Sequence, residues 1–160
     1  MSARYEINRN EDGNSYQFIT SSGNTYIAYF TEFILQDKHN NEIPTVSFGF
    51  SCKLGNEQKP QRHDTKIKRT IIYIINKFFN AQPADSILYL CMNQDGRAKN
   101  RHITFDRWFK EAGEDLEKYD APDESARHNF YCSIIVKSAN PDKQKLVDAF
   151  FYTLEFWGLG

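Results

Sequence analysis

The chain contains few cysteine, glycine and proline residues and no long hydrophobic run. Its 160 residues include three Cys, eight Gly and five Pro. So little glycine and proline excludes collagen-like and low-complexity chains. Three cysteines with no CxxC pair exclude a disulfide scaffold and a cysteine zinc site. Because no apolar stretch of about 18 residues and no signal-peptide pattern occurs, we expect a cytoplasmic protein with no membrane span.

Neither sign of charge is in excess. The 20 Lys and Arg residues are balanced by 21 Asp and Glu, which leaves a formal net charge of −1. This balance excludes a global positive field that would attract nucleic acid or an anionic membrane, so any such binding requires a local patch. Hydrophobic residues make up 40% of the chain and aromatic residues 15%. That content is enough to build the core of one globular domain, which we expect to span residues 1–160.

The first half of the sequence predicts an antiparallel meander of about four strands. The turns "EDGN" and "GN" separate "RYEINRN", "SYQFITSS" and "TYIAYFTEFIL", and "TVSFGFSCKL" follows after a polar turn. Both faces of the third segment are largely apolar or aromatic, with Glu32 the one charge, so we expect a central strand that is covered on both sides. Each cysteine lies in an apolar, strand-like stretch, where we expect it to be buried and reduced: Cys52, Cys91 and Cys132.

The second half alternates helices and strands. "DTKIKRTIIYIINKFF" has isoleucines at helical spacing, with Asp64 as the predicted cap. "TFDRWFKEAGEDLEKY" predicts a second helix, capped by Thr104 and including Leu116, and "NPDKQKLVDAFFYTLEFW" a third, capped by Asn140. The strands "ILYLCM" and "HNFYCSIIVKS" lie between them. The sequence therefore predicts an α+β domain with a mostly antiparallel sheet, helices packed on that sheet, and any parallel pairing confined to the second half.

One candidate site is the loop "NQDGRAKNRHIT", which leaves the carboxyl end of a predicted strand and enters a helix. Loops in this position hold ligands in many open sheets. Residues 97–110 hold five Lys and Arg and one Asp, whereas residues 111–124 hold seven Asp and Glu and one Lys. The alternative interpretation is that these two stretches neutralise each other on a solvated helix surface.

A second basic segment, "KPQRHDTKIKR", precedes and enters the first helix. Two basic loops that each enter a helix could face one another and bind a phosphate, a carboxylate or an acidic partner, because helix amino termini favour anions and arginine makes bidentate contacts. The sequence thus predicts a binding or regulatory module. Its predicted contact surface consists of Arg62, His63, Lys66, Arg69, Arg97, Arg101, His102 and Arg107.

Familiar catalytic motifs are absent. The sequence contains no P-loop, GxGxxG, GxSxG, HExxH or EF-hand pattern, and we predict neither a metal site nor a cofactor. A small nuclease-like enzyme stays an alternative, with Asp95, Arg97 and His102, or His63 and Asp64, as its acid–base groups. The apolar faces of the meander also favour a protein partner or self-association. In the closing "EFWGLG" we expect Trp157 to complete the apolar stripe of the last helix against the sheet, with an exposed anchor for a partner as the alternative.

Three segments, "YEINRNEDGNSYQFITSSG", "KRTIIYIINKFF" and "DGRAKNRHITFDRWF", are similar to a family of small bacterial proteins known only as a domain of unknown function. This resemblance covers nearly the whole chain and implies a bacterial, intracellular protein, without an activity or a catalytic residue. A second, weaker resemblance concerns layout alone: the order of strands, helix, "ILYLCMN" and helix is similar to the core of GNAT-type acetyltransferases.

The GNAT resemblance implies an acyltransferase that binds the pyrophosphate of acetyl-CoA through a glycine-rich loop before its first core helix. Here that position holds "GNEQKPQRHDTKIK", with no glycine after Gly55. Side chains therefore occupy the place where backbone amides would approach a phosphate. The sequence also ends in a long predicted helix where that family has strands.

Overall fold

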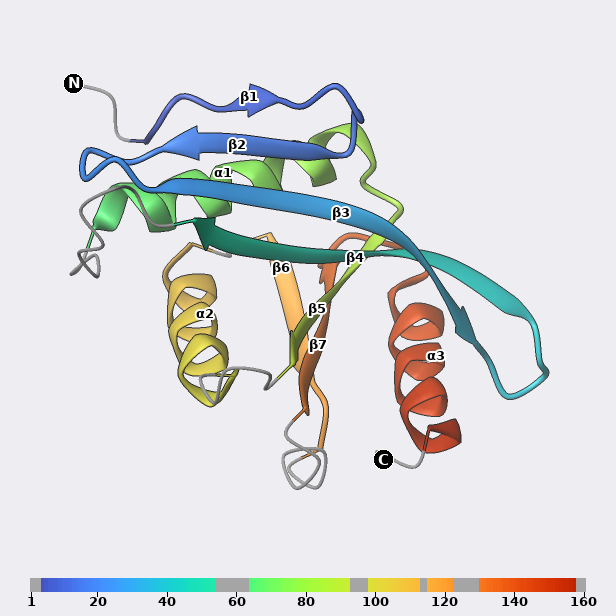
Figure 1. Cartoon of the computed structure of the whole chain (residues 1–160). Coiled ribbons are helices and arrows are strands. Elements are labelled where there is room, and N and C mark those ends of the chain that lie inside the picture. The colour runs from blue at the N-terminus through green and yellow to red at the C-terminus, as the bar shows by residue number, and fades with distance from the viewer. Residues whose placement is uncertain (1–3, 54–63, 93–97, 113–114, 123–129, 158–160) are drawn as a thin grey trace.

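The structure, a computed structural model, describes residues 4–53, 64–92, 98–112, 115–122 and 130–157. These residues form seven strands and three helices, which confirms the predicted α+β class (Figure 1). In chain order the elements are β1 (Asn8–Arg9), β2 (Ser15–Ile19), β3 (Thr25–Gln36), β4 (Glu42–Lys53), α1 (Thr65–Ala81), β5 (Ser86–Met92), α2 (Ala98–Ala112), β6 (Leu116–Asp120), β7 (Phe130–Lys137) and α3 (Lys143–Phe156).

The strands form one mixed sheet in the order β1-β2-β3-β4-β5-β7-β6. Every neighbouring pair in the described residues is antiparallel except β4 and β5, which are parallel and joined through α1. The prediction that parallel pairing is confined to the second half is therefore wrong. The sequence missed the strand β6, which follows α2 and pairs antiparallel with β7. Because the chain reverses between β6 and β7, β7 runs antiparallel to β5.

The predicted helix over "TFDRWFKEAGEDLEKY" is half correct. The helix α2 begins at Ala98, before the predicted cap Thr104, and ends at Ala112. Leu116, assigned to that helix from its spacing, is instead the first residue of β6. Gly113 follows α2 directly in the sequence, and glycine is the residue that most often ends helices.

The sheet opens between β4 and β5. The ladder that joins them contains only the pairs Val46↔Ile87, Ser47↔Leu88 and Phe48↔Tyr89, whereas β3 and β4 pair along their full twelve-residue lengths. In Figure 1 the strands β3 and β4 run across the molecule and β5 and β7 run down it, so the two arms form a V. The V is open at the carboxyl ends of β4 and β5.

Helices cover both faces of the sheet. On one face α1 and α2 bury the larger core, and on the other face α3 buries a second core against β3, β5 and β7. Complete burial of side chains such as Phe48, Phe105 and Phe150 contributes about 1.5–3 kcal/mol each. α2 lies between the arms of the V in Figure 1. The ring centroids of Phe105 and Tyr89 in β5 are 3.9 Å apart. Those of Trp108 and Phe50 in β4 are 6.2 Å apart.

Local signals explain why α1 starts and packs as predicted. Asp64 is its N-cap and accepts a hydrogen bond from the backbone N–H of Lys66 at 2.9 Å. The hydroxyl of Tyr5 donates a second hydrogen bond to the same carboxylate. The predicted isoleucine stripe is buried at Ile67, Ile71, Ile74 and Ile75.

Three other expectations need correction. α3 begins at Lys143, so Asn140 is not its cap; the buried Asn140 side chain instead accepts from the N–H of Asp142 at 2.8 Å, one turn earlier. The strand β3 is not covered along both faces, since Ala28 and Leu35 are buried but Tyr29 and Ile34 are exposed. Cys52 is exposed at the end of β4, whereas Cys91 and Cys132 are buried as predicted.

Candidate functional site

The two basic segments of the sequence follow neighbouring parallel strands. Residues 54–64 lead from β4 into α1, and residues 93–97 lead from β5 into α2. Because β4 and β5 are parallel, their carboxyl ends lie on the same side of the sheet, where open sheets commonly bind ligands. Both α1 and α2 therefore begin on the open side of the V (Figure 1).

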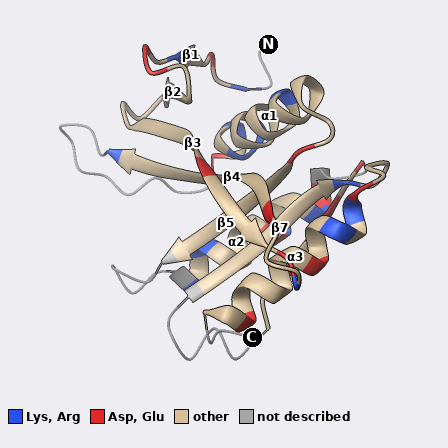
Figure 2. Cartoon of the chain, turned by 90° about the vertical axis from the view of Figure 1, so that its right-hand side faces the viewer, with Lys and Arg blue, Asp and Glu red and all other residues tan. Residues whose placement is uncertain are grey.

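The eight predicted contact residues are placed as follows. Arg62, His63 and Arg97 lie outside the described residues. Lys66 and Arg69 are in the first turns of α1, and Arg101, His102 and Arg107 are in α2. The Lys66 ammonium nitrogen lies 4.7 Å from the centre of the Tyr5 ring, while Arg69 and Arg107 are exposed. Figure 2 shows charged residues gathered on helices and strand ends, with the central strands mostly uncharged.

The described basic residues do not form one compact cluster. An ion pair between Lys68 and Glu111 joins the first turns of α1 to the last turn of α2. Arg101 lies ten residues before Glu111, which corresponds to about 15 Å along the helix axis. The start of α1 and the start of α2 are thus separated by most of the length of α2, with Arg107 between them.

The two helix starts differ in their capacity for an anion. The carboxylate of Asp64 already occupies the N-terminus of α1, where it accepts from the Lys66 N–H. α2 has no acidic residue in its first turn. An incoming anion therefore competes with a built-in carboxylate at α1 and meets no such competitor on the first turn of α2.

A buried ionic cluster lies beside His102, and the sequence did not reveal it. The side chain of Lys118 in β6 is only 3% exposed, and its ammonium contacts the carboxylates of Asp106 in α2, at 2.9 Å, and Asp120 in β6. Ser133 in β7 donates a hydrogen bond to Asp120 Oδ1 at 2.6 Å. The cluster joins α2, β6 and β7, and it escaped prediction because residues 116–118 were assigned to a helix.

The surroundings of His102 favour the neutral form of its imidazole. Its ring stacks on Tyr131 with centroids 5.1 Å apart, and its Nδ1 atom is buried without a hydrogen-bond partner in the described part of the chain. Burial and the nearby Lys118 charge lower the pKa of His102 below its ordinary value, although Asp120 and Asp106 act in the opposite direction. A neutral imidazole can accept a proton or donate one hydrogen bond to a ligand.

Other chemistry is less well supported by the described residues. Burial raises the pKa of the Cys91 thiol, which therefore lacks the thiolate character of a nucleophile. Within the described ranges no group of three His, Cys, Asp or Glu residues could hold a metal ion. His63 and Asp95, proposed for nuclease chemistry, lie outside those ranges. None of the three helices described is long and apolar enough to cross a membrane.

The fold and site define an α+β protein whose mixed sheet opens between two parallel strands, each followed by a basic helix start. Residues 63–152 match the Family of unknown function (DUF6169), and the chain belongs to this family. The resemblance to a family of unknown function is thus confirmed. No curated protein and no solved structure matches the chain significantly, so the layout resemblance to GNAT-type acetyltransferases gains no support from these comparisons.

Proposed function

We propose that this protein is a cytoplasmic binding module for an extended anionic ligand, bearing more than one phosphate or carboxylate group, that lies along α2 from the carboxyl end of β5 to the start of α1. The observation that carries the proposal is the parallel pairing of β4 and β5. Because of this pairing, the helices that follow the two strands begin on the same side of the sheet; one carries Lys66 and Arg69, and the other carries Arg101 and Arg107. The distance of about 15 Å along α2 between Arg101 and Glu111, which pairs with Lys68 near the start of α1, favours an extended ligand over a single phosphate.

Charge pairing supports arginine as the contact residue. The acidic residues near α2 are engaged by lysines: Asp106 by Lys110 and Lys118, and Glu111 by Lys68. Neither Arg69 nor Arg107 has an acidic partner among the described residues. Their exposed guanidinium groups are therefore available for bidentate contacts with phosphate or carboxylate.

The test is calorimetric titration with a polyphosphate chain long enough to span both helix starts, and with pyrophosphate as the short comparison. We expect the long chain to bind at least about tenfold more tightly, because it reaches both groups of cations. The double variant Arg69→Ala/Arg107→Ala should lose about tenfold or more in affinity for the long chain. The matched variant Lys38→Ala/Lys145→Ala removes two exposed charges elsewhere and should change the affinity by less than about twofold.

Equal affinities for the two phosphate chains would contradict the extended site. Equal losses in the two double variants would show that binding follows net charge and not these arginines. Competition with an acidic peptide tests a protein ligand. A peptide that displaces polyphosphate from the unmodified chain, but not from the Arg69→Ala/Arg107→Ala variant, would indicate that the ligand is an acidic protein segment.

A second candidate function, acyl transfer of the GNAT type, is favoured by one observation. The parallel strands β4 and β5 separate after only three residue pairs, and the chain that follows β4 leads into α1, which is the position that the layout resemblance implies for binding the pyrophosphate of acetyl-CoA. The test is the thermal midpoint with and without coenzyme A, followed by thiol release from acetyl-CoA. A higher midpoint with coenzyme A, lost in Arg69→Ala, would support it; no change would contradict it.

A further inference from the structure

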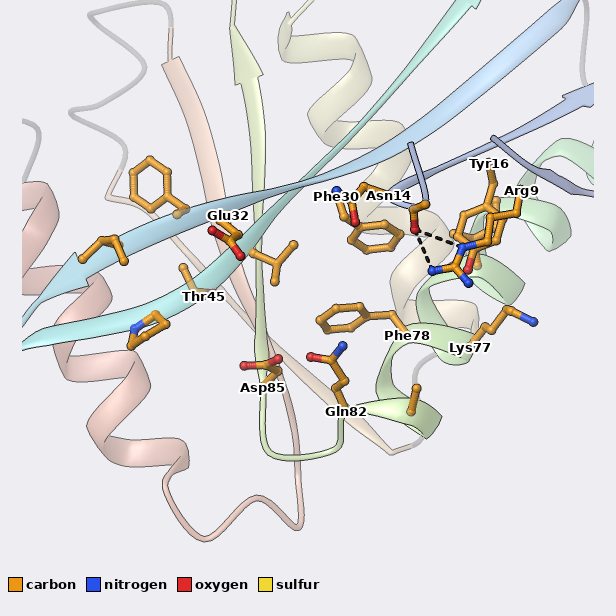
Figure 3. Close-up of a pocket in the computed structure, with 17 residues that line it drawn as sticks. Arg9, Asn14, Tyr16, Phe30, Glu32, Thr45, Lys77, Phe78, Gln82 and Asp85 are labelled. Carbon is orange, nitrogen blue, oxygen red and sulfur yellow. Dashed lines mark hydrogen bonds between the residues drawn. The ribbon is translucent and has the colours of Figure 1, made fainter. Parts of the chain in front are cut away.

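A separate groove of about 700 Å³ lies beside the C-terminal half of α1 (Figure 3). Its walls come from four parts of the chain: the β1–β2 turn, the strands β3 and β4, the last turns of α1, and the turn between α1 and β5. Lys77 and Ala81 line the groove, whereas Lys66 and Arg69 are in the first turns of α1. The groove is therefore distinct from the anion site proposed at the helix starts.

Charges of opposite sign occupy the two ends of this groove. In Figure 3 Arg9 and Lys77 lie on one side of the aromatic pair Phe30 and Phe78, and Glu32 and Asp85 lie on the other side. Both Nε and Nη2 of Arg9 donate to the carbonyl oxygen of Gly13, at 3.0 and 2.7 Å. These two bonds orient the guanidinium before any ligand arrives, which reduces the entropy lost on binding.

The carboxylates at the other end are free to accept a cation. Glu32 belongs to β3 and Asp85 precedes β5. Neither side chain makes a hydrogen bond or an ion pair with any described residue. Burial raises the pKa of Asp85, and a bound cation would favour the ionised form of this carboxyl group.

The middle of the groove is apolar. The rings of Phe30 and Phe78 stack with centroids 5.0 Å apart and planes at 11°, and both side chains are half-buried. Val46 and Ile34 lie on the same side of the sheet as Phe30, and Ile34 is exposed. This surface offers hydrophobic contact and aromatic faces to a ligand whose charged groups reach the two ends.

We propose that the groove binds a short peptide with free termini, its amino group at Glu32 and Asp85, its carboxylate at Arg9 and Lys77, and its apolar side chains on Phe30 and Phe78. Charge complementarity selects this class, because a ligand with a single charge would leave one end of the groove without a counterion. The volume of about 700 Å³ is within the usual range for small-ligand sites, about 300–1,000 Å³, and accommodates more than one amino acid.

The experiment titrates the full chain with trileucine and with two blocked forms, the N-acetylated and the C-amidated tripeptide. We expect the free tripeptide to bind and each blocked form to bind at least about tenfold more weakly, because each loses one charged contact. Trialanine should bind more weakly than trileucine, since it has less apolar surface to cover Phe30 and Phe78.

Variants assign each terminus to one end of the groove. Glu32→Gln/Asp85→Asn should weaken binding of the free tripeptide by at least about tenfold and leave the weak binding of the N-acetylated form unchanged. Lys77→Met should weaken binding of the free tripeptide but not of the C-amidated form. Glu155→Gln, an exposed carboxylate on α3, is the matched control and should bind the tripeptide as the unmodified chain does.

Blocked and free tripeptides that bind equally would overturn the proposal, as would the absence of binding by any free tripeptide. A loss of affinity for the N-acetylated form in Glu32→Gln/Asp85→Asn would also overturn the assignment of the amino group to this end. Circular dichroism and the thermal midpoint of each variant confirm that the fold is intact, and the blocked peptides test the same contacts without altering the protein.

Discussion

At the scale of single residues, His102 links the stability of the protein to pH. Its pKa is lowered in the fold, chiefly by burial and then by Lys118. The unfolded chain therefore binds this proton more readily than the folded chain does. The free energy of unfolding should fall as the pH decreases below the ordinary histidine value of 6.5, and this contribution should be fully present above that value.

The variant His102→Phe tests this prediction. Phenylalanine keeps a ring that can stack on Tyr131, removes the unpartnered Nδ1 atom, and cannot be protonated. We expect its thermal midpoint to decrease less than that of the unmodified chain between about pH 7.5 and about pH 5.5. The control is His39→Gln, at an exposed position. The thermal midpoint of this control should decrease with pH as that of the unmodified chain does. If the midpoint of His102→Phe decreases by the same amount as that of the control, another group causes the pH dependence.

At the scale of elements, Lys118 attaches α2 to the edge strand β6. The buried ammonium depends on two carboxylates that are themselves 29% and 45% exposed, Asp106 and Asp120. Loss of the carboxylates leaves a buried charge without compensation, which typically costs about 3–5 kcal/mol. Loss of the lysine leaves two carboxylates that water can reach.

We therefore expect an asymmetry between the two sides of this cluster. Asp106→Asn/Asp120→Asn should lower the free energy of unfolding by about 3–5 kcal/mol, and Lys118→Met should lower it by clearly less. Urea denaturation followed by circular dichroism measures both values. Equal losses would mean that the cluster acts mainly through packing of the lysine side chain.

At the scale of the whole molecule, the sheet separates two cores, yet we predict that they unfold together. Each layer contains one tryptophan: Trp108 packs with the core of α1 and α2, and Trp157 contacts Phe33 edge-on at 5.6 Å on the side of α3. The strands β5 and β7 contribute alternate side chains to both cores. Loss of either core should therefore remove support for the other.

Single-tryptophan variants measure this cooperativity. Trp157→Phe reports on the α1 and α2 layer, and Trp108→Phe reports on the α3 layer. In each variant the fluorescence transition in urea should coincide with the transition followed by circular dichroism of the same protein. A fluorescence transition that precedes the other in one variant would show that the layers unfold as two units and that residues 1–160 are not one domain.

The features that the sequence predicts correctly depend on local signals. The cap Asp64 and the isoleucines of α1 are recognisable within a single helix, and the meander follows from its turns and alternating residues. Strand β6 was missed because its acidic residues resemble an exposed helix surface; only the alternation of Leu116 and Lys118 with Glu117 indicates a strand. The parallel pairing of β4 with β5 depends on tertiary packing, which no single segment encodes.

The peptide groove shows the same limit more strongly. Arg9, Glu32 and the stretch that holds Lys77 and Asp85 come from three separate parts of the chain, and no spacing in the sequence connects them. One signal was present: Glu32 follows Tyr26, Ala28 and Phe30 on the same face of β3, where a charge on an otherwise apolar face requires a reason. The predicted basic surface was easier to find because its residues are neighbours in the sequence.

The short ladder between β4 and β5 also determines how the molecule can bend. Three residue pairs form a narrow hinge between two arms that are each stiffened by longer antiparallel ladders. The helix α2 packs against both arms: Trp108 stacks on Phe50 in β4, and Phe105 stacks on Tyr89 in β5. The angle of the V is therefore supported by the packing of α2 against both arms as well as by the short ladder, and we expect a substitution at Trp108 or Phe105 to affect both arms.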